Sequence, residues 1–318
     1  MFTLSQLESA AELVYSLMQP TPQIHWPLLS ARCGCEVWVK HENHTPIGSF
    51  KLRGGLVYVD ELRRAEPGVV GLVAETSGNH GQSLAFAGRR AGLSVLLVVP
   101  RGTHPERLAM LRARGAEVVE HGRDSDEAIA YTGEVAAGRG FHPAPSFHPW
   151  LVRGVASLGL ELLRAVPGLD TVYVPIGIGT GFCGMIAARQ ALGSGTEIVG
   201  VVPEGSPTYA LSFAAGAPRP TDAVDTIATG LAIRNPDPEA LDIVLAHAAR
   251  VISVSDAEIA AAIHHFHTDT HNLVEPSGAA ALAALLRERD AMAGRRVGLV
   301  ASGGNIDADL YAKILGGG

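Results

Sequence analysis

A chain of 318 residues, of which 47% are hydrophobic and 18% charged, is long enough for a large core and predicts two domains. The formal net charge of −7, without any run of Lys or Arg, argues against a nucleic-acid partner. No apolar run reaches the roughly 20 residues that span a bilayer, so we expect no membrane segment.

The N-terminus and the cysteines indicate the compartment. The first residues predict an amphipathic helix without the basic start of a signal peptide. Cys33, Cys35 and Cys183 have the spacing neither of a disulfide framework nor of a common zinc pair. We therefore expect free thiols in a reducing cytoplasm.

Short apolar strands alternate with helical segments along the rest of the chain. We expect strands at 35–42, 69–75, 94–100, 116–121, 171–177, 197–204, 250–255 and 295–302. Helices are expected at about 49–64, from about 79, and at 106–114, 124–138, 184–192, 256–267 and 277–289. This alternation is typical of βαβ units with parallel sheets, and two sets of them predict two α/β domains with a cleft between them.

The first segment with chemical potential runs from His44 to Gly55 and contains Lys51. Only three of the 25 basic residues are lysines: Lys40, Lys51 and Lys313. Pro46 and Gly48 favour a turn, Ser49 is a candidate N-cap, and Lys51 then falls in the first helical turn. The helix dipole and burial there favour the neutral amine that Schiff-base chemistry requires. A solvated surface lysine is the alternative.

Two further loops follow strands and open helices. Backbone N–H groups of the loop from Glu75 to Gln82 can bind a phosphate or a carboxylate, with Ser77 and Asn79 as added donors, although an ordinary capped loop would look the same. The glycine-rich loop from Val174 to Gly184 has the mechanism of a phosphate cradle. That loop also fits GxGxxG, and Glu204 after the next strand leaves a dinucleotide site open as a second interpretation.

The last segment, from Ala301 to Asn305, ends a strand at the sheet edge where open α/β folds bind ligands. Ser302 can hydrogen-bond a ring nitrogen there, and a simple glycine turn is the alternative.

Together with Glu275–Ala279, these four segments resemble the fold-type II pyridoxal-phosphate enzymes in both order and spacing. That family includes threonine/serine dehydratases, serine racemase and, more distantly, cysteine synthases. The resemblance implies a two-domain α/β fold like that of tryptophan synthase β, with mostly parallel sheets flanked by helices. It implies a large cofactor-binding domain of residues 1–65 and 148–318, a small mobile domain of residues 66–147, and a homodimer.

The resemblance also implies a role for each matching position, with pyridoxal 5′-phosphate as the cofactor. Lys51 would hold the cofactor through a Schiff base, Phe50 would pack near its ring, Asn79 would bind its 3′-oxygen and Ser302 its pyridine nitrogen. Ser77 would act on the substrate and hold its carboxylate with Thr76, Gly78, Asn79 and His80. The phosphate would be bound by Gly177, Ile178, Gly179, Thr180 and Gly181. Gly230 and Glu275 would line the pocket.

Three departures from the family pattern matter. The loop lacks four consecutive glycines, so Thr180 is expected to donate a hydroxyl to the phosphate. Val202 stands where some members carry a cation-binding Glu, so no metal site is expected. The sequence ends soon after Asn305, so we expect no regulatory domain and no feedback by isoleucine.

The predicted reaction is β-elimination from a β-hydroxy-α-amino acid such as threonine, serine or phenylserine, giving a 2-oxo acid and ammonia. Phe147, His148 and Trp150 are predicted to line the side of the β-substituent, with hinge packing as the alternative. Surface or packing roles, rather than metal binding, are expected for the histidines at 264, 265, 267 and 271.

Three other functions stay open at this point. An amino-acid racemase or a β-replacement synthase would use the same scaffold. A nicotinamide-dependent dehydrogenase would explain GxGxxG and Glu204 but not Lys51. A non-catalytic ligand-binding protein would be expected to lack the lysine.

Overall fold

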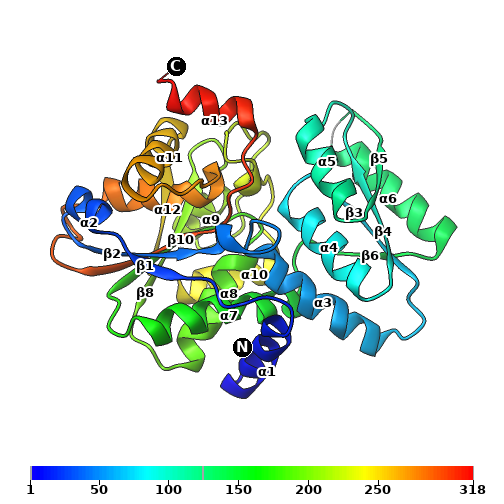
Figure 1. The fold of residues 1–318 in the computed structure, drawn as a ribbon, viewed down its shortest axis with the longest axis horizontal. Helices are drawn as coiled ribbons and strands as arrows, with labels where there is room; N and C mark the ends of the chain where they lie inside the picture. Colours follow the sequence, from blue (N-terminus) through cyan, green and yellow to red (C-terminus); the bar gives the residue numbers. More distant parts are fainter. Residues whose placement is uncertain (1, 124, 318) are drawn as a thin grey trace.

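The strands of the computed structural model, which describes residues 2–123 and 125–317, form two separate sheets (Figure 1). The larger sheet has the order β1-β2-β10-β7-β8-β9 and the smaller has the order β5-β4-β3-β6. Among the strands of the described residues, β1 and β2 pair antiparallel and the other neighbouring strands pair parallel. The predicted class, α/β with mostly parallel sheets, is therefore confirmed.

The larger sheet is built from the two ends of the sequence and the smaller sheet from its middle. The larger sheet contains β1 (Gln23–His25), β2 (Glu36–His41), β7 (Thr171–Pro175), β8 (Glu197–Pro203), β9 (Arg250–Val254) and β10 (Arg296–Ala301). The smaller one contains β3 (Gly71–Glu75), β4 (Ser94–Val99), β5 (Glu117–Glu120) and β6 (His142–Pro143). All four strands of the smaller sheet fall within 66–147, while the domain boundaries themselves stay a prediction.

Helices cover both sheets. Around the larger sheet lie α1 (Leu4–Tyr15), α2 (Pro27–Cys33), α7 (Pro149–Ala165), α8 (Thr180–Ala191), α9 (Thr208–Ala215), α10 (Pro238–His247), α11 (Asp256–Thr270), α12 (Pro276–Arg287) and α13 (Ala308–Leu315). The smaller lobe, on the right of Figure 1, carries α4 (Asn79–Arg90), α5 (Pro105–Ala113) and α6 (Ser125–Arg139). Two short 3₁₀ helices are η1 (Glu42–His44) and η2 (Thr229–Leu231).

Helix α3 (Lys51–Ala65) joins the two lobes because it packs on α7 in the larger lobe and on α4 in the smaller one (Figure 1). It also carries Lys51 as its first residue. Any cavity that Lys51 faces is thus positioned by both lobes.

The central strands of the larger sheet are buried on both faces, which explains their continuous apolar sequence. In β7, Val172 and Val174 belong to one hydrophobic cluster, while Tyr173 between them belongs to the cluster on the other face. Successive strand residues point to opposite faces, so both faces need apolar side chains.

In the described part of the chain, every helix is too short or too polar to cross a bilayer.

Candidate active site

A cavity of about 850 Å³ opens where the loops after β3, β7 and β10 come together. These loops all leave the carboxyl ends of parallel strands, the edge at which open α/β sheets bind ligands. Fifteen of the seventeen predicted site residues line the cavity: Phe50, Lys51, Thr76, Ser77, Gly78, Asn79, His80, Gly177, Ile178, Gly179, Thr180, Gly181, Gly230, Glu275 and Ser302.

Of the three lysines, Lys51 is the one that lines the cavity. Lys40 is fully buried and forms an ion pair with Glu161, and Lys313 is exposed on α13. The Lys51 ammonium nitrogen lies 5.2 Å from the centroid of the Phe50 ring. Of the three lysines, Lys51 is therefore the remaining candidate for an amine nucleophile in this cavity.

Burial lowers the pKa of the Lys51 amine from 10.5 to about 8, although the neighbouring Glu275 carboxylate opposes that shift. Desolvation disfavours the charged ammonium, while a nearby anion favours it. At neutral pH the amine is thus far easier to deprotonate than an exposed lysine, as nucleophilic use requires.

The turn before Lys51 is fixed by side-chain and backbone hydrogen bonds. Gly48 adopts a φ of +71°, which favours glycine, and Thr45 Oγ1 both accepts from the Ser49 N–H and donates to the Ser49 carbonyl at 2.8 Å. The N-cap is Phe50, so the prediction of Ser49 at that position was wrong by one residue. Ser49 is held instead by Thr45 and by a bridge to Gly303.

That bridge joins the first and last segments of the sequence pattern. The Phe50 N–H donates to the Ser302 carbonyl at 3.1 Å, and the Gly304 N–H donates to the Gly48 carbonyl at 2.9 Å. Residues some 250 positions apart thereby form one wall of the cavity.

A buried carboxylate, Glu275, lies at the start of α12 with 6% exposure. Asn79 Nδ2 donates to both of its oxygens at 2.8 and 3.1 Å, and the Asn305 N–H donates at 3.1 Å. Asn305 Nδ2 also donates to Asn79 Oδ1 at 2.7 Å. Burial raises the pKa of Glu275 to about 7, against these donors. The chain Glu275–Asn79–Asn305 fixes the Asn79 amide at the cavity wall.

The glycine loop requires glycine at two positions. Gly179 is the N-cap of α8 with a φ of +110°, and a Cβ there would lie 2.5 Å from the Ala240 Cβ. A Cβ on Gly177 would lie 2.4 Å from the Gly230 carbonyl oxygen. The backbone of this loop and the free N–H groups of the first turn of α8 form a cradle suited to an anion.

His80 and Gln82 at the start of α4 each carry a buried polar atom without a partner among the described residues, His80 Nε2 and Gln82 Oε1. Burial, reinforced by Lys51, lowers the pKa of His80 to about 3, so the ring is neutral. Because both residues line the cavity, these atoms suit a bound polar ligand.

Two predicted substrate residues are not among those lining the cavity. Phe147 packs against the hydrophobic core of the larger lobe. His148 caps α7 by accepting the Trp150 N–H at 3.1 Å, and its ring meets Tyr58 edge-on at 5.4 Å. The structure thus corrects their placement: helix α7, which was not predicted, uses them as packing and capping residues.

Several cavity residues were missed from the sequence. Asn305 belongs to the recognised segment 301–305, so its amide was a visible signal. Arg107, Asp222 and Asp307 lie outside every motif, and only the meeting of the two lobes brings them to the cavity.

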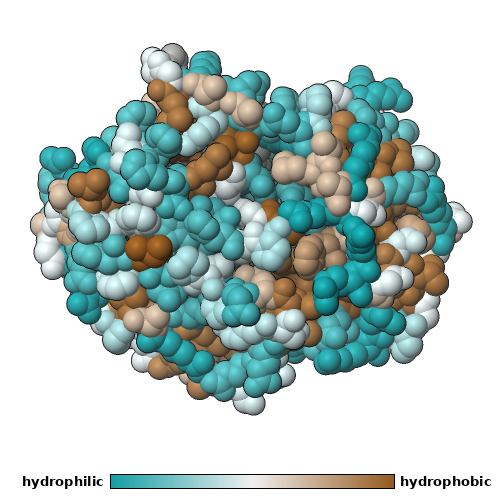
Figure 2. All heavy atoms as spheres, in the orientation of Figure 1, coloured by the Kyte–Doolittle hydropathy of each residue, from teal (hydrophilic) through white to brown (hydrophobic). Residues whose placement is uncertain are grey.

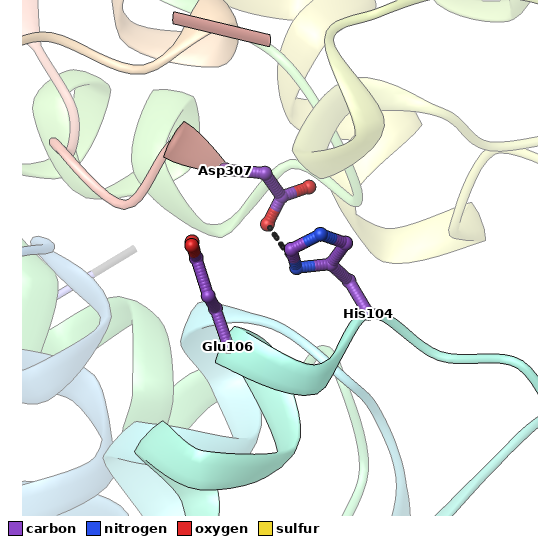
Figure 3. Close-up of side chains that lie close together, drawn as sticks. All are labelled: His104, Glu106 and Asp307. Atoms are coloured by element: carbon purple, nitrogen blue, oxygen red, sulfur yellow. Dashed lines mark ion pairs between the residues drawn. The ribbon is translucent and has the colours of Figure 1, made fainter. Parts of the chain in front are cut away.

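Among the described residues, one group of potential metal ligands lies within 4.8 Å: His104, Glu106 and Asp307 (Figure 3). Arg107, however, donates to both Asp307 oxygens at 3.0 and 2.7 Å, and Glu106 accepts the Ala308 N–H at 3.2 Å. We interpret the group as a contact between α5 and the start of α13.

With the geometry established, the fold and site define a cofactor-dependent enzyme. The chain belongs to the pyridoxal-phosphate dependent enzyme family, whose model matches residues 14–303.

Known proteins are similar to this one in sequence and in structure over almost the whole chain. It is 32% identical to an L-threo-3-hydroxyaspartate ammonia-lyase from a Pseudomonas species, with 97% of each chain covered. A processed threonine deaminase from Solanum lycopersicum has a TM-score of 0.91 at 28% identity, covering 98% of this chain and 92% of that one. A pyridoxal 5′-phosphate-dependent aspartate racemase has a TM-score of 0.90 at 27% identity, covering 96% and 97%.

The residues fit that cofactor. The glycine cradle would hold a phosphate and the Lys51 amine would meet an aldehyde, with the aromatic ring of Phe50 beside it. Glu204, required by the dinucleotide interpretation, forms an ion pair with Arg287 at 3.2 Å and does not line the cavity.

Proposed function

We propose that this protein is a lyase that uses pyridoxal 5′-phosphate to eliminate water from a β-hydroxy-α-amino acid such as serine, threonine or phenylserine, after which hydrolysis of the resulting enamine takes up one water and releases ammonia. The products are a 2-oxo acid and ammonia. One observation carries the proposal: the Lys51 amine, the glycine cradle and the Thr76–His80 loop open into the same cavity. The ammonia-lyase and deaminase among the similar proteins support it.

The residues divide the work between binding and proton transfer. When bound, pyridoxal phosphate supplies an aldehyde for the substrate amine and a ring that withdraws electrons from Cα. Lys51 Nζ removes the proton from the substrate Cα, for which its lowered pKa is suited. The Ser77 hydroxyl and the N–H groups around it bind the substrate carboxylate at the start of α4.

Ser302 controls the outcome through its lack of charge. As the partner of the pyridine nitrogen, a neutral hydroxyl favours electron withdrawal less than a carboxylate would. This weaker withdrawal favours prompt loss of the β-hydroxyl over transamination.

A spectrum of the purified protein tests the cofactor assignment. We expect a visible absorbance band that borohydride abolishes, that Lys51→Ala lacks and that Lys313→Ala keeps. Incubation with serine and threonine should then release a 2-oxo acid and ammonia in equal amounts. A protein that stays colourless after addition of the cofactor would contradict the proposal.

Racemisation is a second candidate, because the Ser77 hydroxyl lines the same cavity as the Lys51 amine and both are able to exchange a proton with Cα. Chiral chromatography after incubation with L-serine separates the two activities. A racemase forms D-serine, and Ser77→Ala abolishes it. We expect 2-oxo acid as the main product.

We further propose that the protein acts as a cytoplasmic homodimer with a mobile small domain of residues 66–147. Three buried free cysteines support a reducing compartment, and two exposed apolar side chains of one short segment, Ile24 on the edge strand β1 and Leu28 on α2, support an apolar interface there. Light scattering would measure the mass in solution.

A further inference from the structure

Apolar side chains from four separate segments line part of the cavity. Met110 lies on α5 and Ile129 on α6, in the smaller lobe. Val224 lies in the loop between α9 and η2. Ile306 lies just before α13, and Leu310 lies in that helix. Both lobes therefore contribute apolar side chains to the cavity lining, and Figure 2 shows hydrophobic spheres among hydrophilic ones where the lobes meet.

Two of these side chains are unusually exposed for their size. Ile129 is 54% exposed and Val224 is 37% exposed, which places both among the large exposed hydrophobic residues of the described chain. A single exposed apolar residue needs no explanation, but two that face one cavity from opposite lobes form a surface suited to an apolar ligand group.

The charges of the same cavity disfavour an acidic substrate side chain. Four carboxylates line it, those of Glu75, Asp222, Glu275 and Asp307. The three basic lining residues are already engaged: Lys51 by its role in the proposed reaction, Arg107 by both oxygens of Asp307, and Arg234 by an interaction of its own. Because these three basic residues already have partners or roles, no cation of the cavity lining is dedicated to a second substrate carboxylate.

Size points the same way. At about 850 Å³ the cavity lies near the upper end of the range of roughly 300–1,000 Å³ that small-molecule sites occupy. It has room for the cofactor and for a substrate larger than serine.

From these observations we propose that the enzyme prefers a β-hydroxy amino acid with an uncharged aromatic β-substituent, such as phenylserine, over a dicarboxylic one such as 3-hydroxyaspartate. The inference rests on the proposed function and names its substrate class. Ile129 and Val224 are the specificity-determining residues, because they present apolar surface to the substituent from the two lobes.

A substrate panel with the holoenzyme tests the preference. We expect kcat/KM for phenylserine to exceed that for threonine, and to exceed that for 3-hydroxyaspartate at least tenfold. If serine or threonine is deaminated but phenylserine is not, or if 3-hydroxyaspartate has the higher kcat/KM, the proposed function stands and this inference is wrong. If no member of the panel yields a 2-oxo acid, the proposed function fails and the inference with it.

Binding without turnover provides a second readout. Phenylalanine and aspartate have no β-hydroxyl to lose, so calorimetric titration of the holoenzyme measures affinity alone. We expect phenylalanine to bind at least tenfold more tightly than aspartate, and the reverse order would overturn the inference.

The variant Ile129→Arg tests whether the apolar lining residue Ile129 determines the substrate preference. It exchanges apolar surface for a cation, and the site is exposed, so folding should be unaffected. We expect the ratio of kcat/KM for phenylserine to that for 3-hydroxyaspartate to fall at least tenfold. Val70→Arg is the matched control, because Val70 is 58% exposed in the same lobe and does not line the cavity. An equal effect of both variants would contradict the assignment.

Discussion

Lys51 is placed where two physical effects oppose its positive charge. It is the first residue of α3, whose N-terminus carries the positive end of the helix dipole, and it lies inside a cavity. The sequence position indicated the first effect directly, whereas burial was only an expectation until the structure placed Phe50, Glu275 and Ser302 with the amine in one cavity. The lowered pKa is thus a property of the folded site.

The pKa of Lys51 predicts how cofactor uptake depends on pH. An amine must be neutral to attack an aldehyde, and the neutral fraction rises about tenfold per pH unit until pH exceeds the pKa. The rate of reconstitution, followed by stopped-flow absorbance, should therefore rise up to about pH 8 and then level off.

The control is the reaction of free cofactor with Nα-acetyl-lysine amide, which corrects for titration of the cofactor itself. A midpoint for the protein near 10.5, as for an unperturbed lysine, would contradict the prediction.

Gly179 allows a second prediction at the scale of one residue. Replacing it with Ala puts a Cβ 2.5 Å from the Ala240 Cβ at a φ of +110°, where L-residues are strained by about 1–3 kcal/mol. Because the strain falls on the phosphate cradle, we expect cofactor affinity, measured by absorbance titration, to fall about tenfold or more.

Gly195→Ala is the matched control for this loop. Gly195 has open space around its Cβ position, so its substitution should leave cofactor affinity unchanged. A Gly179→Ala protein that binds the cofactor as tightly as the control would refute the role of the loop backbone.

At the scale of elements, the buried strands and their helices were predictable because an apolar run bounded by turns carries its own signal. Helix α7 was missed because its first residues, Pro149 and Trp150, were interpreted as part of a substrate segment. Helix α8 begins at Thr180 rather than at the predicted Gly184, since two glycines among its first five residues, Gly181 and Gly184, lowered the helical signal. The short strand β1 is defined only by its pairing with β2.

The same division applies to the site. Motif residues such as Asn79 and Ser302 were predictable because each lies beside a glycine turn at a strand end. Arg107 and Asp307 carry no local signal, since their significance depends on two lobes that meet across 200 residues of sequence.

Buried ion pairs of Arg53 anchor helix α3, and they are the basis of a third prediction. Arg53 donates to the Glu42 carboxylate at 2.7 and 2.9 Å and to the Glu161 carboxylate at 2.6 and 2.9 Å, and all three are buried or nearly so. Although burial opposes it, Arg53 and Lys40 hold the pKa of Glu42 below its usual range.

Removing Arg53 leaves buried carboxylates without their main partner. We expect Arg53→Met to lower the free energy of unfolding by about 3–5 kcal/mol, measured by urea denaturation. Arg164→Met breaks an exposed pair with Glu8 and should cost about 1 kcal/mol or less. Equal effects of the two substitutions would show that the buried network does not anchor α3.

At the scale of the whole molecule, a polar contact between two residues of the cavity lining links the two lobes. Arg107 on α5 of the smaller lobe holds Asp307 of the larger lobe through two hydrogen bonds, with Glu106 and His104 beside them (Figure 3). The side chains of Arg107 and Asp307 are 26% and 16% exposed, so water screens this ion pair only in part. Both residues line the cavity, so with a mobile smaller lobe, as proposed above, the contact would stabilise a closed arrangement of the lobes around the substrate.

Asp307→Asn should therefore act on substrate binding more than on chemistry. Loss of the charge leaves a weaker hydrogen bond to Arg107, and a cost of about 1–2 kcal/mol corresponds to roughly a five- to thirtyfold change in an equilibrium. We expect KM for serine to rise by that order while kcat changes little, since turnover occurs from the closed arrangement. Hydrogen exchange of 104–113 should become faster.

The control is Arg112→Gln, also on α5, which removes an exposed pair with Glu120 of β5. Neither residue lines the cavity, so the KM of this variant should match that of the unmodified protein. If Asp307→Asn lowers kcat at constant KM, then Asp307 acts on the reacting atoms instead. If neither constant changes, the Arg107–Asp307 contact does not govern access to Lys51.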